Sequence, residues 1–281
     1  MRRRLALAAL ASLAAAGACT EVTTDPQAPV SLAFDSLPAP AIVAGDSLRT
    51  VDGAAVALTA RAFNVDGDEI ADAPVTFTVV PPDTTAAARA AVGVSPEGYV
   101  LAADTARAGA ATYRIVAQVG SLQSRPTART SLTVVPRPDS LEAVAPTGVD
   151  TVLFYAVPDT TSGGRRAVNV KARVLHDSTP APVGVGPYLV RFEVKGDSAA
   201  PAVLDSVRFV NLTRRELTTV ATTATSGEAT ARLLAYPKAG ATAADSVILV
   251  ARAWLGASAT RALPARLAEV RLVVRLSGAL P

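Results

Sequence analysis

Hydrophobic and polar residues alternate along the segment 56–80, VALTARAFNVDGDEIADAPVTFTVV. In its first half, one face is apolar and consists of Val56, Leu58, Ala60 and Ala62. In its second half, the corresponding face consists of Val75, Phe77 and Val79. A period of two is typical of half-buried strands. The residues 64–68, NVDGD, separate the halves and favour a turn, because Gly67 tolerates a positive φ. The segment predicts a strand, a turn and a second strand.

The same alternation recurs along the chain, with turn signals at roughly 8 to 12 residue spacing. The further segments predicted as strands are 30–34, 112–119, 168–174, 188–194, 229–233, 247–253 and 270–276. Short strands at this spacing indicate an all-β fold with two tandem antiparallel β-sandwich domains. We expect the first domain at 30–136 and the second at 139–281, with prolines between them. A repeat as long as a whole domain favours beads on a string rather than a solenoid.

The second domain is longer than the first, chiefly through residues 159–164 and 196–226. These two regions are predicted as extra loops, where specific binding would most readily be added. Trp254 has the parity opposite to Val247 and Leu249 in its strand. It is therefore expected to cover a sheet edge or a seam between the domains.

The segment 56–80 resembles the tandem bacterial Ig-like domains of invasin, intimin and related surface proteins. The residues that match the family pattern are Asp66, Gly67, Pro74, Val75 and Phe77. The resemblance implies an Ig-like fold used as a structural or adhesive module, and it implies no catalytic residues.

Residues 1–18 have the pattern of a signal peptide. Arg2, Arg3 and Arg4 precede an apolar stretch that is too short to span a membrane comfortably. Cys19, the one cysteine of the chain, follows small residues, which resembles a bacterial lipoprotein signal, although Ala16 stands where Leu is usual. Two outcomes stay open: lipidation of Cys19, with Thr20 favouring the outer membrane, or simple secretion. Residues 19–29 are expected to be a flexible tether.

Removal of residues 1–18 changes the charge of the chain. It lowers Lys+Arg from 27 to 24, which equals the 24 Asp+Glu, so the formal net charge falls from +3 to zero. With no long Lys/Arg run remaining, nucleic acid is not expected as a partner. A single cysteine also excludes an internal disulfide, so each sandwich depends on apolar packing.

The residues that could do chemistry are few. His176, the only histidine, lies beside Asp177 and Ser178, and a surface turn is favoured over a Ser-His-Asp site because no nucleophile-elbow motif occurs. One histidine cannot supply a usual zinc site. The acids of the turn 64–69 could bind calcium, although hairpins need Asp-Gly for steric reasons alone. Residues 163–166, GGRR, lack the frame of a phosphate loop.

These observations predict a protein that is not an enzyme, with no catalytic, cofactor-binding or metal-binding residues and Cys19 as a lipidation site. We expect an exported monomer on the outer membrane or cell surface, otherwise periplasmic or secreted. Two functions stay open. The first is a structural, adhesive or protein-interaction module, and the second is a dedicated binding module for an envelope glycan or protein through loops of the second domain.

Overall fold

The computed structural model describes residues 28–104, 111–119, 126–144, 151–153, 167–178, 180–195, 207–211, 214–235, 246–256 and 266–277. The predicted signal peptide, Cys19 and residues 159–166 lie outside these ranges. The described chain is almost entirely β-strand, which confirms the predicted all-β class. Its one α-helix, α2 (Ala86–Ala91), begins after Thr85, whose side chain accepts a hydrogen bond from the Ala88 amide.

The first group of strands pairs only within itself and forms what we name the N-terminal sandwich. One sheet has the order β1-β3-β4, a second β2-β9-β8-β5, and a third β6-β7. All pairings are antiparallel except β2 with β9. The strands are β1 (Ser31–Phe34), β2 (Ala41–Val43), β3 (Ala60–Phe63), β4 (Glu69–Ile70), β5 (Val75–Val80), β6 (Val92–Val94), β7 (Val100–Ala102), β8 (Thr112–Val119) and β9 (Thr127–Val135).

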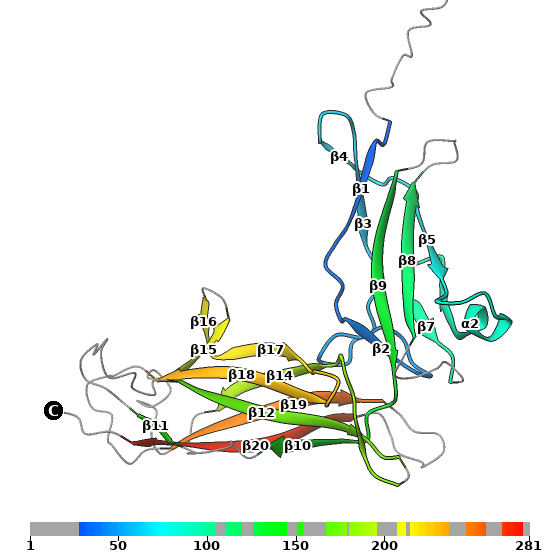
Figure 1. Ribbon diagram of the computed structural model, residues 1–281. Helices are drawn as coiled ribbons and strands as arrows, with labels where there is room; N and C mark the ends of the chain where they lie inside the picture. Colours follow the sequence, from blue (N-terminus) through cyan, green and yellow to red (C-terminus); the bar gives the residue numbers. More distant parts are fainter. Residues whose placement is uncertain are drawn as a thin grey trace, which may run out of the picture.

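The remaining strands form the C-terminal sandwich of two sheets. One has the order β10-β12-β18-β15-β16, with β13 on β12, and the other β11-β20-β19-β14-β17. Its strands are β10 (Ser140–Val144), β11 (Thr151–Leu153), β12 (Ala167–His176), β13 (Val183–Gly184), β14 (Leu189–Lys195), β15 (Val207–Asn211), β16 (Arg214–Glu216), β17 (Thr218–Thr222), β18 (Glu228–Ala235), β19 (Ser246–Leu255) and β20 (Arg266–Ser277). Figure 1 shows the strands of the two sandwiches running crosswise, which gives the pair a bent outline.

The side chains predicted to face inward fill the cores. In the N-terminal sandwich, Tyr113 and Ile115 of β8 pack with Leu132 and Val134 of β9. In the C-terminal sandwich, Phe192 and Phe209 come from different sheets and are both fully buried, with ring centroids 6.3 Å apart. The period-two pattern therefore identified the buried faces of β8 and β14 correctly, whereas Phe209 belongs to a region that was predicted as a loop.

The two strands predicted within 56–80 do not pair with each other as a hairpin. β3 pairs across the turn with the two-residue strand β4, whereas β5 lies in the other sheet and pairs with β8. Because the chain crosses between sheets after β4, the two alternating halves face each other across a core instead of sharing one sheet. Phe34 and Phe77 meet there with centroids 5.9 Å apart.

The prediction of an inserted loop over 196–226 is also wrong for the part that the structure describes. β15 pairs with β18, and β17 pairs with β14, so this region supplies strands to both sheets of the C-terminal sandwich. Val207 and Phe209 of β15 are fully buried. The threonines of β17 give it the composition of a loop, so the sequence did not indicate a strand there. Such residues are tolerated because an edge strand exposes half of its side chains.

Candidate functional site

His176 contacts a backbone carbonyl and a carboxylate of the segment that joins the sandwiches. It ends β12, and its Nδ1 lies 2.8 Å from the Arg137 carbonyl oxygen and 2.8 Å from Asp139 Oδ2. The Ser178 hydroxyl instead donates to the Ala181 carbonyl at 2.6 Å. The histidine therefore links β12 to the segment that joins the sandwiches, and these neighbours do not form a Ser-His-Asp triad.

The acidic turn 64–69 is organised by its own backbone. Asn64 Oδ1 accepts hydrogen bonds from the amides of Asp66 and Asp68, at 3.0 and 2.8 Å. Gly67 takes a φ of 84°, and the Glu69 carboxylate lies 3.4 Å from Arg61. No cluster of three or more His, Cys, Asp or Glu suited to a metal ion occurs among the described residues. The turn residues thus have a conformational role, and the absence of a calcium site there stays a prediction.

A small crevice lies where the two sandwiches meet. Its volume is about 20 Å³, which is room for roughly one water molecule. Its walls come from β2, from the segment after β2, and from the starts and ends of C-terminal strands: Ala39, Pro40, Ala41, Val43, Asp46, Ser47, Arg49, Thr50, Val51, Tyr188, Leu189 and Trp254. A sugar ring or a peptide side chain does not fit into such a space. The residues around the crevice therefore form the contact between the two sandwiches, which we name the joint, rather than a ligand pocket.

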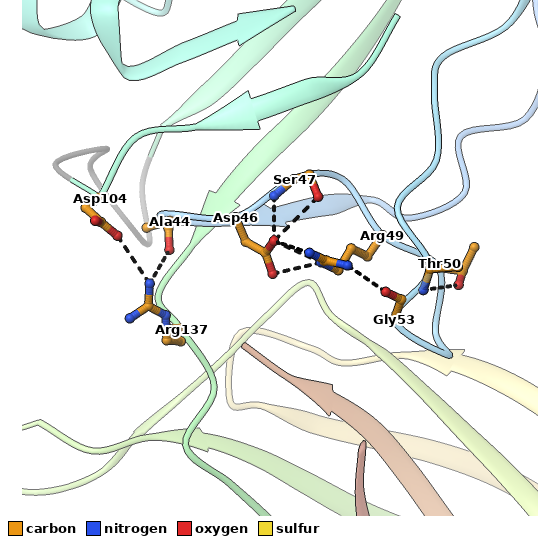
Figure 2. Close-up of polar contacts among 9 residues, drawn as sticks. Ala44, Asp46, Ser47, Arg49, Thr50, Gly53, Asp104 and Arg137 are labelled. Atoms are coloured by element: carbon orange, nitrogen blue, oxygen red, sulfur yellow. Dashed lines mark hydrogen bonds and ion pairs between the residues drawn. The ribbon is translucent and has the colours of Figure 1, made fainter. Parts of the chain in front are cut away.

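Arg49 is fixed on the N-terminal side of this joint. Its Nε donates to both carboxylate oxygens of Asp46, at 2.9 and 3.0 Å, and its Nη1 donates to the Gly53 carbonyl at 2.8 Å (Figure 2). The guanidinium carbon lies 5.4 Å from the centroid of the Trp254 ring, on the C-terminal side. This distance is within the range of a cation–π interaction. Asp46 thus orients a cation of one sandwich toward the indole of the other.

Tyr188 supplies the polar anchor on the C-terminal side. Its hydroxyl donates to the Trp254 carbonyl at 2.6 Å, and its amide donates to the buried Thr223 hydroxyl at 2.8 Å. That hydroxyl in turn donates to the Val185 carbonyl at 2.6 Å. Burial raises the pKa of Tyr188, the Asp46 carboxylate raises it further, and Arg49 opposes the change. The phenol is therefore neutral and acts as a hydrogen-bond donor.

Of these residues, sequence reasoning found one. Trp254 was expected at a sheet edge or a seam between domains, and its position in the joint confirms the seam. Arg49, Asp46 and Gly53 were missed, because they belong to an irregular segment without strand periodicity. The Asp52-Gly53 dipeptide signals a turn but does not indicate what the turn contacts.

No family model matches this chain, and no curated protein matches it significantly. Among solved structures, the EC1-2 segment of human protocadherin-24 is 16% identical, with 90% of this chain and 100% of that chain covered and a TM-score of 0.28. Domains 1-6 of the surface layer protein SbsC are 15% identical, with 89% of this chain and 28% of that chain covered and a TM-score of 0.28.

A SusE-like surface-located polysaccharide-binding protein from the Bacteroides thetaiotaomicron heparin utilisation locus is 12% identical, with 90% of this chain and 34% of that chain covered and a TM-score of 0.25. Such TM-scores do not establish a shared fold over whole chains. The description of this protein as two β-sandwiches rests on its own strand pairings. Among the described residues, no helix is long and apolar enough to cross a membrane.

Proposed function

We propose that this protein is an exported, non-catalytic lipoprotein of the bacterial cell envelope. In this proposal, two Ig-like domains, 30–136 and 139–281, form a structural, adhesive or protein-interaction module tethered through residues 19–29 to lipid on Cys19. The proposal is supported by the contacts of His176 and by the small size of the crevice. His176 bonds the segment between the sandwiches, and the joint crevice has room only for about one water.

Lipidation is tested by metabolic labelling. We expect the wild-type chain to incorporate labelled palmitate and to fractionate with outer membranes. The Cys19→Ser variant removes the thiol that would carry the lipid, with little change in shape, so it is expected to lose both the label and the membrane association. Unlabelled mature wild-type protein in the medium would contradict the lipid anchor and leave simple secretion.

A second candidate function is a dedicated binding module for an envelope glycan or protein. It is favoured by two exposed apolar side chains beside and on the edge strand β17, Leu217 at 41% and Val220 at 43% exposure. An edge strand also leaves backbone groups unpaired, which a partner strand could bind. Deletion of 196–226 would remove β15 and β17 and unfold the sandwich, so the surface has to be tested by substitution.

To distinguish the two functions, we would measure how much of the purified mature chain is retained on isolated cell envelopes. A Leu217→Ser/Val220→Ser double variant changes the edge surface, and Val183→Ser, at a residue 52% exposed in β13, is the matched control. Loss of retention in the double variant alone would favour the binding module. Equal retention of all three proteins would favour the structural module.

A further inference from the structure

The hydrophobic core does not end at the border between the sandwiches. Three side chains of the N-terminal strands, Ala41 and Val43 of β2 and Val135 of β9, belong to the same buried cluster as the core of the C-terminal sandwich. They are 5%, 5% and 0% exposed. Rotation of one sandwich against the other would expose them to water, which opposes the rotation.

The irregular segment after β2 fits closely against the C-terminal sandwich. Gly53 has a φ of 84°, and a Cβ atom placed on it would lie 2.2 Å from Cε3 of Trp254. Beside it, the Asp52 carboxylate lies 2.6 Å from Nη1 of Arg191 on β14. Contact this tight leaves no space for the indole and the turn to slide past each other.

The connection between the sandwiches is fixed as well. Residues 136–139 are the whole link between β9 and β10, and Pro136 and Pro138 each restrict the backbone φ. The Asp139 amide donates to the Leu175 carbonyl at 2.8 Å, and its Oδ2 accepts from the Asp177 amide at 2.8 Å. Together with the contact of His176 to Arg137, these bonds attach the link to the C-terminal sandwich along its length.

From the shared core, the Gly53–Trp254 fit and the bonded link, we infer that the two sandwiches form a single rigid body with a fixed bend. We name the bend at the joint the elbow. Contact with Trp254 holds the elbow at one angle, so the sandwiches do not move about it as about a hinge. Flexible neighbouring domains, the default expectation for a short polar interface, would have none of these three features. The inference does not depend on export, on Cys19 or on any ligand, so it can fail while the proposed function stands.

The test is a distance measurement between spin labels by double electron–electron resonance on the full mature chain. Cys19→Ser removes the only native cysteine. Labels at the exposed positions Thr78 of β5 and Arg271 of β20, introduced as Thr78→Cys and Arg271→Cys, span the elbow. A pair within one sandwich, Arg232→Cys of β18 with Arg271→Cys of β20, places the labels on the exposed faces of its two different sheets and gives the width expected for a rigid unit. We expect the two distance distributions to be equally narrow.

A broad or multi-peaked distribution across the elbow, beside a narrow one within the sandwich, would overturn the inference. This comparison needs no destabilising substitution and so decides the question in the wild-type background. A narrow distribution at a distance incompatible with the bend in Figure 1 would overturn it equally.

Two glycines offer a matched pair of variants. Gly53 and Gly67 share a φ of 84°, so Gly53→Ala and Gly67→Ala carry the same backbone strain, but a Cβ at Gly67 meets nothing within 4 Å. Gly53→Ala is expected to shift or broaden the distance across the elbow, while Gly67→Ala leaves it unchanged. Adding Trp254→Ala to Gly53→Ala removes the collision and should abolish the difference between the two glycine sites. Equal effects of both single variants would contradict a lock at Trp254.

Discussion

Replacing Tyr188 with phenylalanine would remove one hydrogen bond from the joint and little else. The Tyr188 side chain is buried, with 9% of the residue exposed, and its hydroxyl donates to the Trp254 carbonyl at 2.6 Å. Tyr188→Phe keeps the ring and its packing against the core. The variant therefore isolates the energetic contribution of the hydroxyl group.

The expected cost follows from the buried acceptor. A net hydrogen bond contributes about 1 kcal/mol, and a buried carbonyl left without its donor costs about 1–3 kcal/mol. Because phenylalanine leaves almost no cavity, the cavity contribution of larger truncations is absent. We expect Tyr188→Phe to lower the free energy of unfolding by about 1–2 kcal/mol at neutral pH.

The same substitution changes the response to alkaline pH. The folded-state pKa of Tyr188 is raised above its ordinary value of 10.0, chiefly by burial. Below about pH 10 the phenol is neutral in both states and its contribution to stability is complete. Above that pH the unfolded chain loses the proton first, so stability falls by about 1.4 kcal/mol per pH unit until the folded phenol also ionises. Tyr188→Phe should remove this part of the alkaline decline.

Urea unfolding followed by fluorescence measures both effects, because Trp254 is the only tryptophan and lies in the joint. Tyr99→Phe is the control, since Tyr99 is 42% exposed and water can replace its partners. A Tyr188→Phe variant as stable as the control at pH 7, or one with an unchanged decline above pH 10, would refute the reasoning.

Three further predictions concern each sandwich separately and are checked by the same urea unfolding. Phe209→Ala empties a fully buried position and should cost about 3–5 kcal/mol, whereas Val220→Ala on an exposed edge should cost within about 0.5 kcal/mol; similar costs would contradict the assigned burial. The hydrogen bond from Arg173 lowers the pKa of Glu228 below 4.5 in the folded protein. The Glu228 carboxylate therefore stabilises the fold above that pH, and this contribution is lost on acidification. Glu228→Gln should make the free energy of unfolding less sensitive to acid. Asn64→Ala loses two hydrogen bonds of its turn and should cost about 1–3 kcal/mol, with or without calcium; a calcium-dependent midpoint in the wild type would show a metal site instead.

The strand faces were predictable because burial of a sheet face imposes a period of two on the local sequence. Tyr113 and Ile115, or Val170 and Ala172, alternate with polar residues and proved to be buried. The alternation lies within each strand's own sequence, so the buried face can be predicted without knowing the partner strand.

Pairing and the joint depend on contacts between residues far apart in sequence. Nothing near Val75 distinguishes pairing with β3 from pairing with β8, since both partners offer the same apolar face. The joint is less predictable still, because Gly53 and Trp254 are linked only by the position of the two sandwiches. The composition of β17, TTVAT, which has three threonines and no alternation, also resembles a loop in sequence.

The placement of Ala41, Val43 and Val135 has a consequence for how such a protein can evolve. The midpoint of the chain, near residues 136–139, is a natural crossover point for recombination, yet these three side chains complete the core of the other half. In a recombinant that exchanged only the second half, these three side chains would pack poorly against the core of the new C-terminal sandwich. The two halves should therefore be inherited together as one unit, and not mixed freely with other domains.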